Sequence, residues 1–141
     1  MAPGKSILAM LALGSALAAQ YTARTELLRE KLESADRNYV FVAMHRGDWR
    51  HAPENSTGAI EGAIAAGADI IELDAALTKD GHIVLLHDGT LGRVSNGTGP
   101  STDYMLEEIR AFRLKDTDGA SLMDYGILTL EEAFALTIGK S

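Results

Sequence analysis

Two short apolar segments on either side of a helix signal constrain this chain more than any other feature. Residues 39–44 are apolar throughout, and residues 68–74 carry the apolar pair Ile-Ile and a Leu, which predicts strands buried on both faces. Between them, Asn55 or Ser56 can cap a helix that ends at Gly67. Strand, helix and strand within about 30 residues predict a parallel βαβ unit and an α/β fold.

Asp80 and Gly81 form a turn signal between two further short segments that we expect to be strands. If the two residues form a two-residue hairpin turn, Asp74 lies opposite His87. A compact crossover between parallel barrel strands is the alternative. Either path returns His87 to the end of the sheet where Asp74 lies.

Three more helices are predicted. Residues 22–38 place leucines on one side among charged residues, which is typical of a packing helix. Further on, Leu106 and Ile109 point inward from a short helix. Thr129 and Glu132 form a capping box that starts a last helix, which ends at about residue 136.

Length and charge exclude several classes of protein. The chain has 141 residues and no cysteine, enough for one modest domain without disulfides or thiolate metal ligands. Its formal charge is -7, from 13 basic and 20 acidic residues, so we expect no nucleic-acid partner. We expect a small-molecule partner instead.

The N-terminus has the pattern of an export signal. Lys5 precedes an uncharged run, and Ala16 and Ala18 supply the small-x-small pattern of a cleavage site. We therefore expect a signal peptide over residues 1–18 and a periplasmic or secreted product. A buried N-terminal helix or an uncleaved anchor is the alternative, and the run is shorter than the roughly 20 apolar residues of a membrane span.

Polar residues stand at three predicted strand ends, where ligands bind in α/β folds: after residue 44, at residues 72–74 and after residue 86. Glu72 and Asp74 lie two positions apart and therefore share a face, and their mutual repulsion favours a divalent cation such as Ca²⁺ or Mg²⁺. His45 and His87 can serve as an acid/base pair. Arg46 offers donors suited to phosphate, so the set predicts metal-assisted hydrolysis of a phosphate ester.

Six short motifs follow one another along the chain: His45-Arg46-Gly47, APENS at residues 52–56, GADIIELD at 67–74, TKDG at 78–81, His87-Asp88 and NGTG at 96–99. In this order they resemble the signature of the glycerophosphodiester phosphodiesterase family, and a Leu-Glu-Glu-Ala stretch at residues 130–133 resembles a later motif of it. The resemblance covers about residues 40–136 and implies a TIM (β/α)8 barrel and a divalent-cation-dependent hydrolase.

The resemblance also implies roles for single residues. His45 would be the general base and His87 the general acid, while Glu72 and Asp74 would hold Ca²⁺ or Mg²⁺. Substrate binding would fall to Arg46 at a phosphate oxygen and to two residues at the mouth of the site, Glu54 and Asn55.

Some features depart from the family pattern. The family has Thr where this chain has Ser56, and Trp49 and His51 can shape a pocket of their own. The family's third acidic ligand and a nearby Lys come from a later strand, beyond Ser141. We expect the domain to start at residue 39, after an N-terminal helix at 19–38, and to include only about the first three strands of a barrel. A chain of this extent is expected to be poorly folded and inactive by itself, because sheet edges stay open.

The leading hypothesis is hydrolysis of glycerophosphodiesters to glycerol phosphate and an alcohol. A phospholipase-like relative of the same superfamily is the second, and a non-catalytic metal-binding or interaction fragment is the third. The sequence does not identify the alcohol, choose between Ca²⁺ and Mg²⁺, or give an oligomeric state.

Overall fold

The computed structural model describes residues 24–34 and 38–138, which divide into two compact units. The described part of the first unit comprises residues 24–34, 38–40 and 138, and the second is Phe41–Thr137. The expected signal peptide at residues 1–18 lies outside the described residues. Among the described helices, none has the length and apolar character required to cross a membrane.

The first unit contains a helix over residues 24–33. On the surface of this helix, Arg29 forms two ion pairs. Its guanidinium lies 2.7 Å from a carboxylate oxygen of Glu26 and 2.8 Å from one of Glu33. These pairs have the three- and four-residue spacings at which side chains meet on a helix. The predicted helix is therefore confirmed over residues 24–33.

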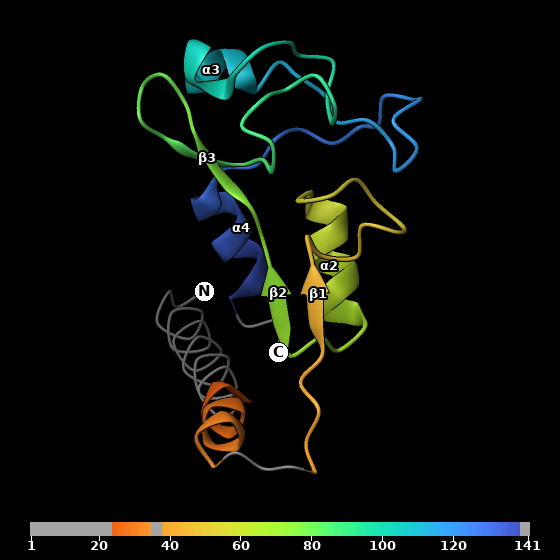
Figure 1. The fold of residues 1–141 in the computed structure, drawn as a ribbon, viewed down its shortest axis with the longest axis vertical. Helices are drawn as coiled ribbons and strands as arrows, with labels where there is room; N and C mark the ends of the chain where they lie inside the picture. Colours follow the sequence, from red (N-terminus) through yellow and green to blue (C-terminus); the bar gives the residue numbers. More distant parts are fainter. Residues whose placement is uncertain (1–23, 35–37, 139–141) are drawn as a thin grey trace, which may run out of the picture. The chain divides into compact units, whose positions relative to one another are not determined.

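The second unit begins with the predicted βαβ motif: β1 (Ala43–His45), α2 (Thr57–Ala65) and β2 (Ile70–Glu72). The two strands pair in parallel, with Ala43 opposite Ile70 and His45 opposite Glu72, and lie side by side in Figure 1. Both strands are shorter than predicted. The parallel register matters for function, because it brings the carboxyl ends of β1 and β2 to the same edge.

Helix α2 starts and ends at the predicted signals. The hydroxyl of Ser56 accepts a hydrogen bond of 3.2 Å from the Ala59 amide, and Gly67 takes a φ of 74° just after the helix. Gly47 lies against the helix, since a Cβ there would be 2.6 Å from the Ala59 carbonyl oxygen. The loop that follows β1 is thus pressed onto the first turn of α2.

The next two strands, β3 (Ala75–Leu77) and β4 (Ile83–Leu85), form an antiparallel hairpin, which decides against the crossover. The expected pairing of Asp74 with His87 is wrong by one residue. Ala75 pairs with Leu85, and the Leu86 amide donates to the carbonyl oxygen of Asp74 at 3.1 Å. His87 nevertheless follows directly after the residue bonded to Asp74.

The turn chemistry explains the shifted register. A two-residue type I′ turn needs positive φ at both central residues. Only Gly81 has it, at 84°, and Asp80 does not. The chain instead makes a wider turn closed by a 2.9 Å hydrogen bond from the Thr78 amide to the His82 carbonyl.

The remaining elements are a short 3₁₀ helix, η1 (Ser101–Asp103), and two α-helices, α3 (Leu106–Ile109) and α4 (Leu130–Thr137). The predicted capping box of α4 is confirmed. The Thr129 amide donates to Glu132 Oε2 at 2.9 Å, and the Glu132 amide donates back to Thr129 Oγ1 at 3.2 Å.

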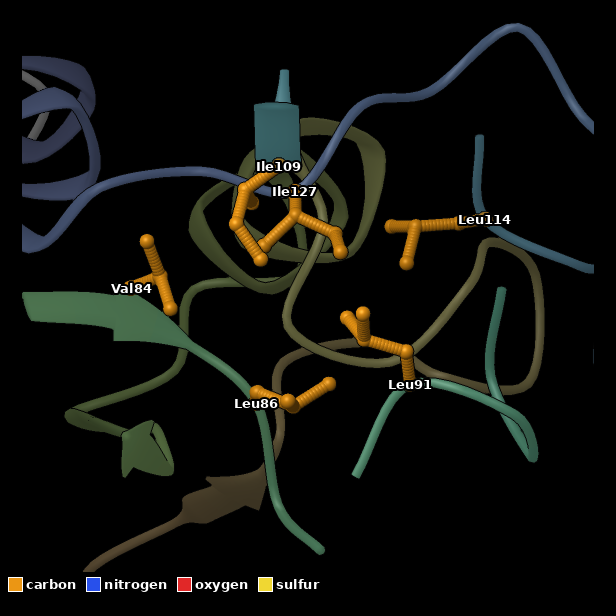
Figure 2. Close-up of a cluster of buried hydrophobic side chains, with 6 residues drawn as sticks. All are labelled: Val84, Leu86, Leu91, Ile109, Leu114 and Ile127. Atoms are coloured by element: carbon orange, nitrogen blue, oxygen red, sulfur yellow. The ribbon is translucent and has the colours of Figure 1, made fainter. Parts of the chain in front are cut away.

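Two apolar clusters hold the second unit together. One joins β4 to the long segment that follows it, through six buried side chains (Figure 2): Val84, Leu86, Leu91, Ile109, Leu114 and Ile127. The other packs Ile60 of α2, Leu85 of β4 and Ala133 of α4 together with Ile71 and Leu73.

The expectation that the strands are buried on both faces is wrong here. Ile71 and Leu73 face the cluster between the helices, but Ile70 is 47% exposed, and Ala43 and Glu72 are exposed as well. Alternate residues of a strand point to opposite faces, so one face of β1 and β2 packs against the helices and the other is open. In a closed barrel that second face is the interior.

The buried clusters predict which substitutions matter for stability. Ile60→Ala should lower the free energy of unfolding by about 2–5 kcal/mol, because Ile60 is fully buried and the change leaves a cavity. Leu77→Ala, at a residue 54% exposed, should change it by no more than about 0.5 kcal/mol. Urea unfolding followed by circular dichroism measures both. Equal losses in the two variants would contradict this account of the core.

Candidate active site

The strand ends bring the first histidine next to the first carboxylate. His45 ends β1 opposite Glu72, and its Nε2 lies 3.9 Å from Glu72 Oε2. Both side chains are largely exposed, at 63% and 46% of their area. They are therefore accessible to a bound molecule at this edge.

Arg46 connects both acidic residues of the predicted metal site. It has a positive φ of 58°, and its amide donates to Glu72 Oε2 at 3.2 Å. Its Nη1 donates to both oxygens of Glu54, at 3.0 and 3.1 Å, and its Nε lies 3.2 Å from Asp74 Oδ2. That Nε is buried and makes no hydrogen bond within the described residues. The contact with Asp74 is therefore an ion pair without hydrogen-bond geometry.

Asn55 holds Asp74 in place from two sides. Its Nδ2 donates to Asp74 Oδ2 and its Oδ1 accepts from the Asp74 amide, both at 3.1 Å. Asn55 is only 3% exposed and has a φ of 59°, a conformation that Asn tolerates better than most residues. Its own amide donates to the Arg46 carbonyl at 3.1 Å, so the two ends of the loop between β1 and α2 are held together.

The second histidine is connected to this group through Arg93. His87 Nδ1 lies 2.6 Å from Asp88 Oδ1, and Arg93 Nε bonds the other oxygen of Asp88. Arg93 also donates to Glu54, from Nη2 to Oε1 at 2.7 Å and from Nη1 to Oε2 at 2.9 Å. Glu54 therefore accepts from both arginines of the site.

These contacts keep the carboxylates ionised. The hydrogen bond from Arg93, and then that from His87, lowers the pKa of Asp88 to about 2. Burial would raise the pKa of Glu54, but the hydrogen bonds and charges of Arg93 and Arg46 outweigh burial and lower it. Glu54 and Asp88 in turn raise the pKa of Arg93, so all three groups carry full charge near neutral pH.

Glu72 and Asp74 have the right chemistry for a hard cation. Among the described residues, neither Oε1 of Glu72 nor Oδ1 of Asp74 takes part in a hydrogen bond, and carboxylate oxygens are what Ca²⁺ and Mg²⁺ prefer. The described part of the chain does not gather three or more acidic or histidine side chains into a metal site. Two ligands therefore fit, and they do not complete a coordination shell.

A cavity of about 340 Å³ lies beside Glu54 and Arg93, and Trp49 and Asp118 are among the residues that line it. Trp49 therefore lines a cavity, as one part of the expectation required. His51 does not line it. Its side chain is 80% exposed and pairs with Asp48 at 2.8 Å.

The structure joins the predicted site residues into one connected group, in which His45 meets Glu72, Arg46 meets Glu54 and Asp74, and His87 reaches Glu54 through two intermediates. Sequence reasoning missed the intermediate Arg93. The available signal was an arginine six positions after His87, in a loop otherwise rich in Gly, Ser and Thr.

Comparison with known proteins identifies the family. The profile of the glycerophosphoryl diester phosphodiesterase family matches residues 45–140. The chain belongs to this family. A glycerophosphodiester phosphodiesterase of Caldanaerobacter subterraneus is 45% identical over 97 residues, which are 69% of this chain and 40% of that relative. Glycerophosphodiester phosphodiesterase 1 of Homo sapiens is 39% identical over 105 residues, 70% of this chain and 30% of the human protein.

Solved structures agree on the fold. A glycerophosphoryl diester phosphodiesterase of Parabacteroides distasonis superposes with a TM-score of 0.64 at 45% identity, over 72% of this chain and 35% of its own. An Oleispira antarctica phosphodiesterase, solved with the product sn-glycerol-3-phosphate, gives 0.63 at 31% identity, over 69% and 39%. The chain therefore has the fold of this family and spans 30–40% of the length of these relatives.

The lowered pKa of Asp88 predicts an acid-sensitive stability. The pKa is about 2 in the folded state against an ordinary 3.8, so the contribution is present above about pH 5 and is lost as pH falls toward 2. Arg93→Gln removes the largest cause of the shift and should flatten this part of the pH dependence. Urea unfolding between about pH 7 and pH 3 measures it.

Arg113→Gln is the matched control. Arg113 lies 3.9 Å from Asp124, which is fully exposed, so the variant should keep the wild-type pH dependence. An unchanged pH dependence in Arg93→Gln would show that Asp88 contributes nothing to acid sensitivity.

Proposed function

We propose that this chain supplies the acid/base and metal-binding part of an active site that hydrolyses glycerophosphodiesters to glycerol phosphate and an alcohol. The observation that carries the proposal is Arg46, whose guanidinium is held by Glu54 and Asp74 and whose backbone amide bonds Glu72, next to the strand-end His45. The names of the relatives and the product bound to the Oleispira antarctica enzyme support the same substrate class.

Arg46 is suited to bind the phosphate. Its Nη1 is held by Glu54 and its Nε lies 3.2 Å from Asp74 Oδ2, and together these contacts fix the guanidinium plane. A planar guanidinium held in this way can donate to a phosphate oxygen without further ordering of its side chain. Glu54 and Asn55 contribute by holding Arg46 and Asp74 at the mouth of the site.

His45 and His87 would transfer the protons. As general base, His45 takes a proton from the attacking oxygen, and as general acid, His87 delivers one to the oxygen of the departing alcohol.

Glu72 and Asp74 would hold the divalent cation, Ca²⁺ or Mg²⁺. When bound, such an ion neutralises negative charge on the phosphate oxygens. Asn55 keeps Asp74 in position for this, because it bonds both the carboxylate and the amide of that residue.

Metal binding tests the carboxylates directly. Glu72→Gln and Asp74→Asn keep the side-chain shape but remove the charge that a hard cation requires, so each should weaken Ca²⁺ or Mg²⁺ binding by about tenfold or more. Isothermal titration calorimetry measures the affinity. Glu61→Gln, on the exposed side of α2, is the control and should bind like the wild type. Unchanged affinity in both site variants would remove these residues from the metal site.

The histidines are tested by steady-state hydrolysis of a glycerophosphodiester, in a protein that carries this segment in a barrel of its relatives' full length. His45→Ala and His87→Ala should each lower kcat by a factor of about 10² or more, the usual size of one acid–base contribution. Each variant should also flatten a different limb of the pH–rate profile. His51→Ala is the control, because that exposed histidine pairs with Asp48. If one site variant lost both limbs while the other behaved like the wild type, the paired roles would be refuted.

A further inference from the structure

The loop after β4 contains an arginine, Arg93, that takes no part in the proton transfers or in the metal and phosphate binding proposed above. Arg93 is 47% exposed, yet three of its nitrogen atoms bond two different carboxylates. Two of those nitrogens hold Glu54 and the third holds Asp88. An isolated surface salt bridge contributes little to stability, whereas here all three guanidinium nitrogens of Arg93 bond carboxylates.

Asp88 divides its oxygens between two partners. Oδ2 accepts from Arg93, and Oδ1 lies 2.6 Å from Nδ1 of His87. Since the pKa of Asp88 is about 2, the carboxylate is ionised and can only accept. The hydrogen between Asp88 and His87 therefore belongs to Nδ1, and Nε2 is the ring nitrogen left for proton exchange.

We propose that Arg93 is a positioning residue that fixes Asp88 and, through it, the Nδ1–H tautomer and the ring orientation of His87. The proposal rests on the proposed role of His87 as the proton donor. With Nδ1–H held by Asp88, Nε2–H gives its proton to the alcohol oxygen as the phosphorus–oxygen bond breaks, and His87 is left neutral with its hydrogen on Nδ1.

Glu54 gives this arrangement a second consequence. The same carboxylate accepts from Nη1 of Arg46 at 3.0 Å and from Nη2 of Arg93 at 2.7 Å. The arginine proposed to bind phosphate and the arginine that positions His87 are thus held by one side chain. Arg93 therefore sets where the proton donor lies relative to the phosphate. A lysine keeps the charge but lacks the planar fork that reaches both carboxylates.

The tautomer of His87 can be observed directly by long-range ¹H–¹⁵N NMR of protein labelled at histidine, at about pH 8, above the ordinary histidine pKa of about 6.5. In the wild type, His87 should carry its hydrogen on Nδ1. Arg93→Gln should reduce that preference, and Arg93→Lys should give an intermediate result. Asp88→Asn, which leaves the Arg93–Glu54 pair in place, should also reduce it.

Arg110→Gln is the matched control. Arg110 is 50% exposed and pairs with Glu132 at 2.9 Å, away from His87, so its loss should leave the tautomer of His87 unchanged. A wild-type His87 that carries its neutral hydrogen on Nε2 would overturn the proposal. So would a folded Arg93→Gln variant with the wild-type tautomer.

Kinetics provides the second readout. In hydrolysis of a glycerophosphodiester, Arg93→Gln should lower kcat by about tenfold, part of the roughly 10²–10⁴ of a complete acid–base contribution, with KM within about twofold. Arg93→Lys should recover part of the loss. A rise in KM with unchanged kcat would overturn the proposal, because Arg93 would then bind substrate. If the wild type does not hydrolyse the diester even within a barrel of its relatives' full length, the proposed function fails, and the NMR result still decides the role of Arg93.

Discussion

The site depends on the carboxylate of Glu54, which lies between two guanidinium groups. Glu54 lies in the loop between β1 and α2, and Arg93 lies in the loop after β4. Their hydrogen bonds connect these two loops. Burying a carboxylate is costly unless it is paired and hydrogen-bonded, and Glu54 meets that condition by accepting from Arg93 and Arg46 with both oxygens. The positions of both proposed substrate-facing groups, Arg46 and His87, follow from this one side chain.

The strand pairing supplies the other half of the arrangement. Parallel register places His45 beside Glu72, and the alternation of side chains puts Glu72 on the open face while Ile71 and Leu73 pack toward the helices. The two-residue alternation of the strand thus places the packing side chains Ile71 and Leu73 on one face and the acidic side chain of Glu72 on the other. Asn55 then connects the two, because it bonds Asp74 while its own backbone is held by Arg46.

Much of this could be predicted from the sequence, because the signals are local. The Ser56 cap, the capping box at Thr129 and the strand-end histidines depend only on near neighbours. What failed depended on longer-range facts. The hairpin register is the exception, because it depended on whether Asp80 as well as Gly81 takes positive φ, which the dipeptide alone does not decide. The exposure of Ile70 depended on what covers the second face of the sheet. Arg93 was missed because its partners, Glu54 and Asp88, come together only in the folded chain.

The central claim is that these strand ends form a metal-assisted glycerophosphodiester hydrolase. The most direct measurement is ³¹P NMR of a glycerophosphodiester in ¹⁸O-labelled water, incubated with a protein that carries this segment in a barrel of its relatives' full length, with Ca²⁺ or Mg²⁺ present or removed by a chelator. The account predicts that the diester signal is replaced by that of glycerol phosphate with ¹⁸O on phosphorus, only when the cation is present. Turnover that persists with chelator, or a diester that remains intact with either cation, would contradict it.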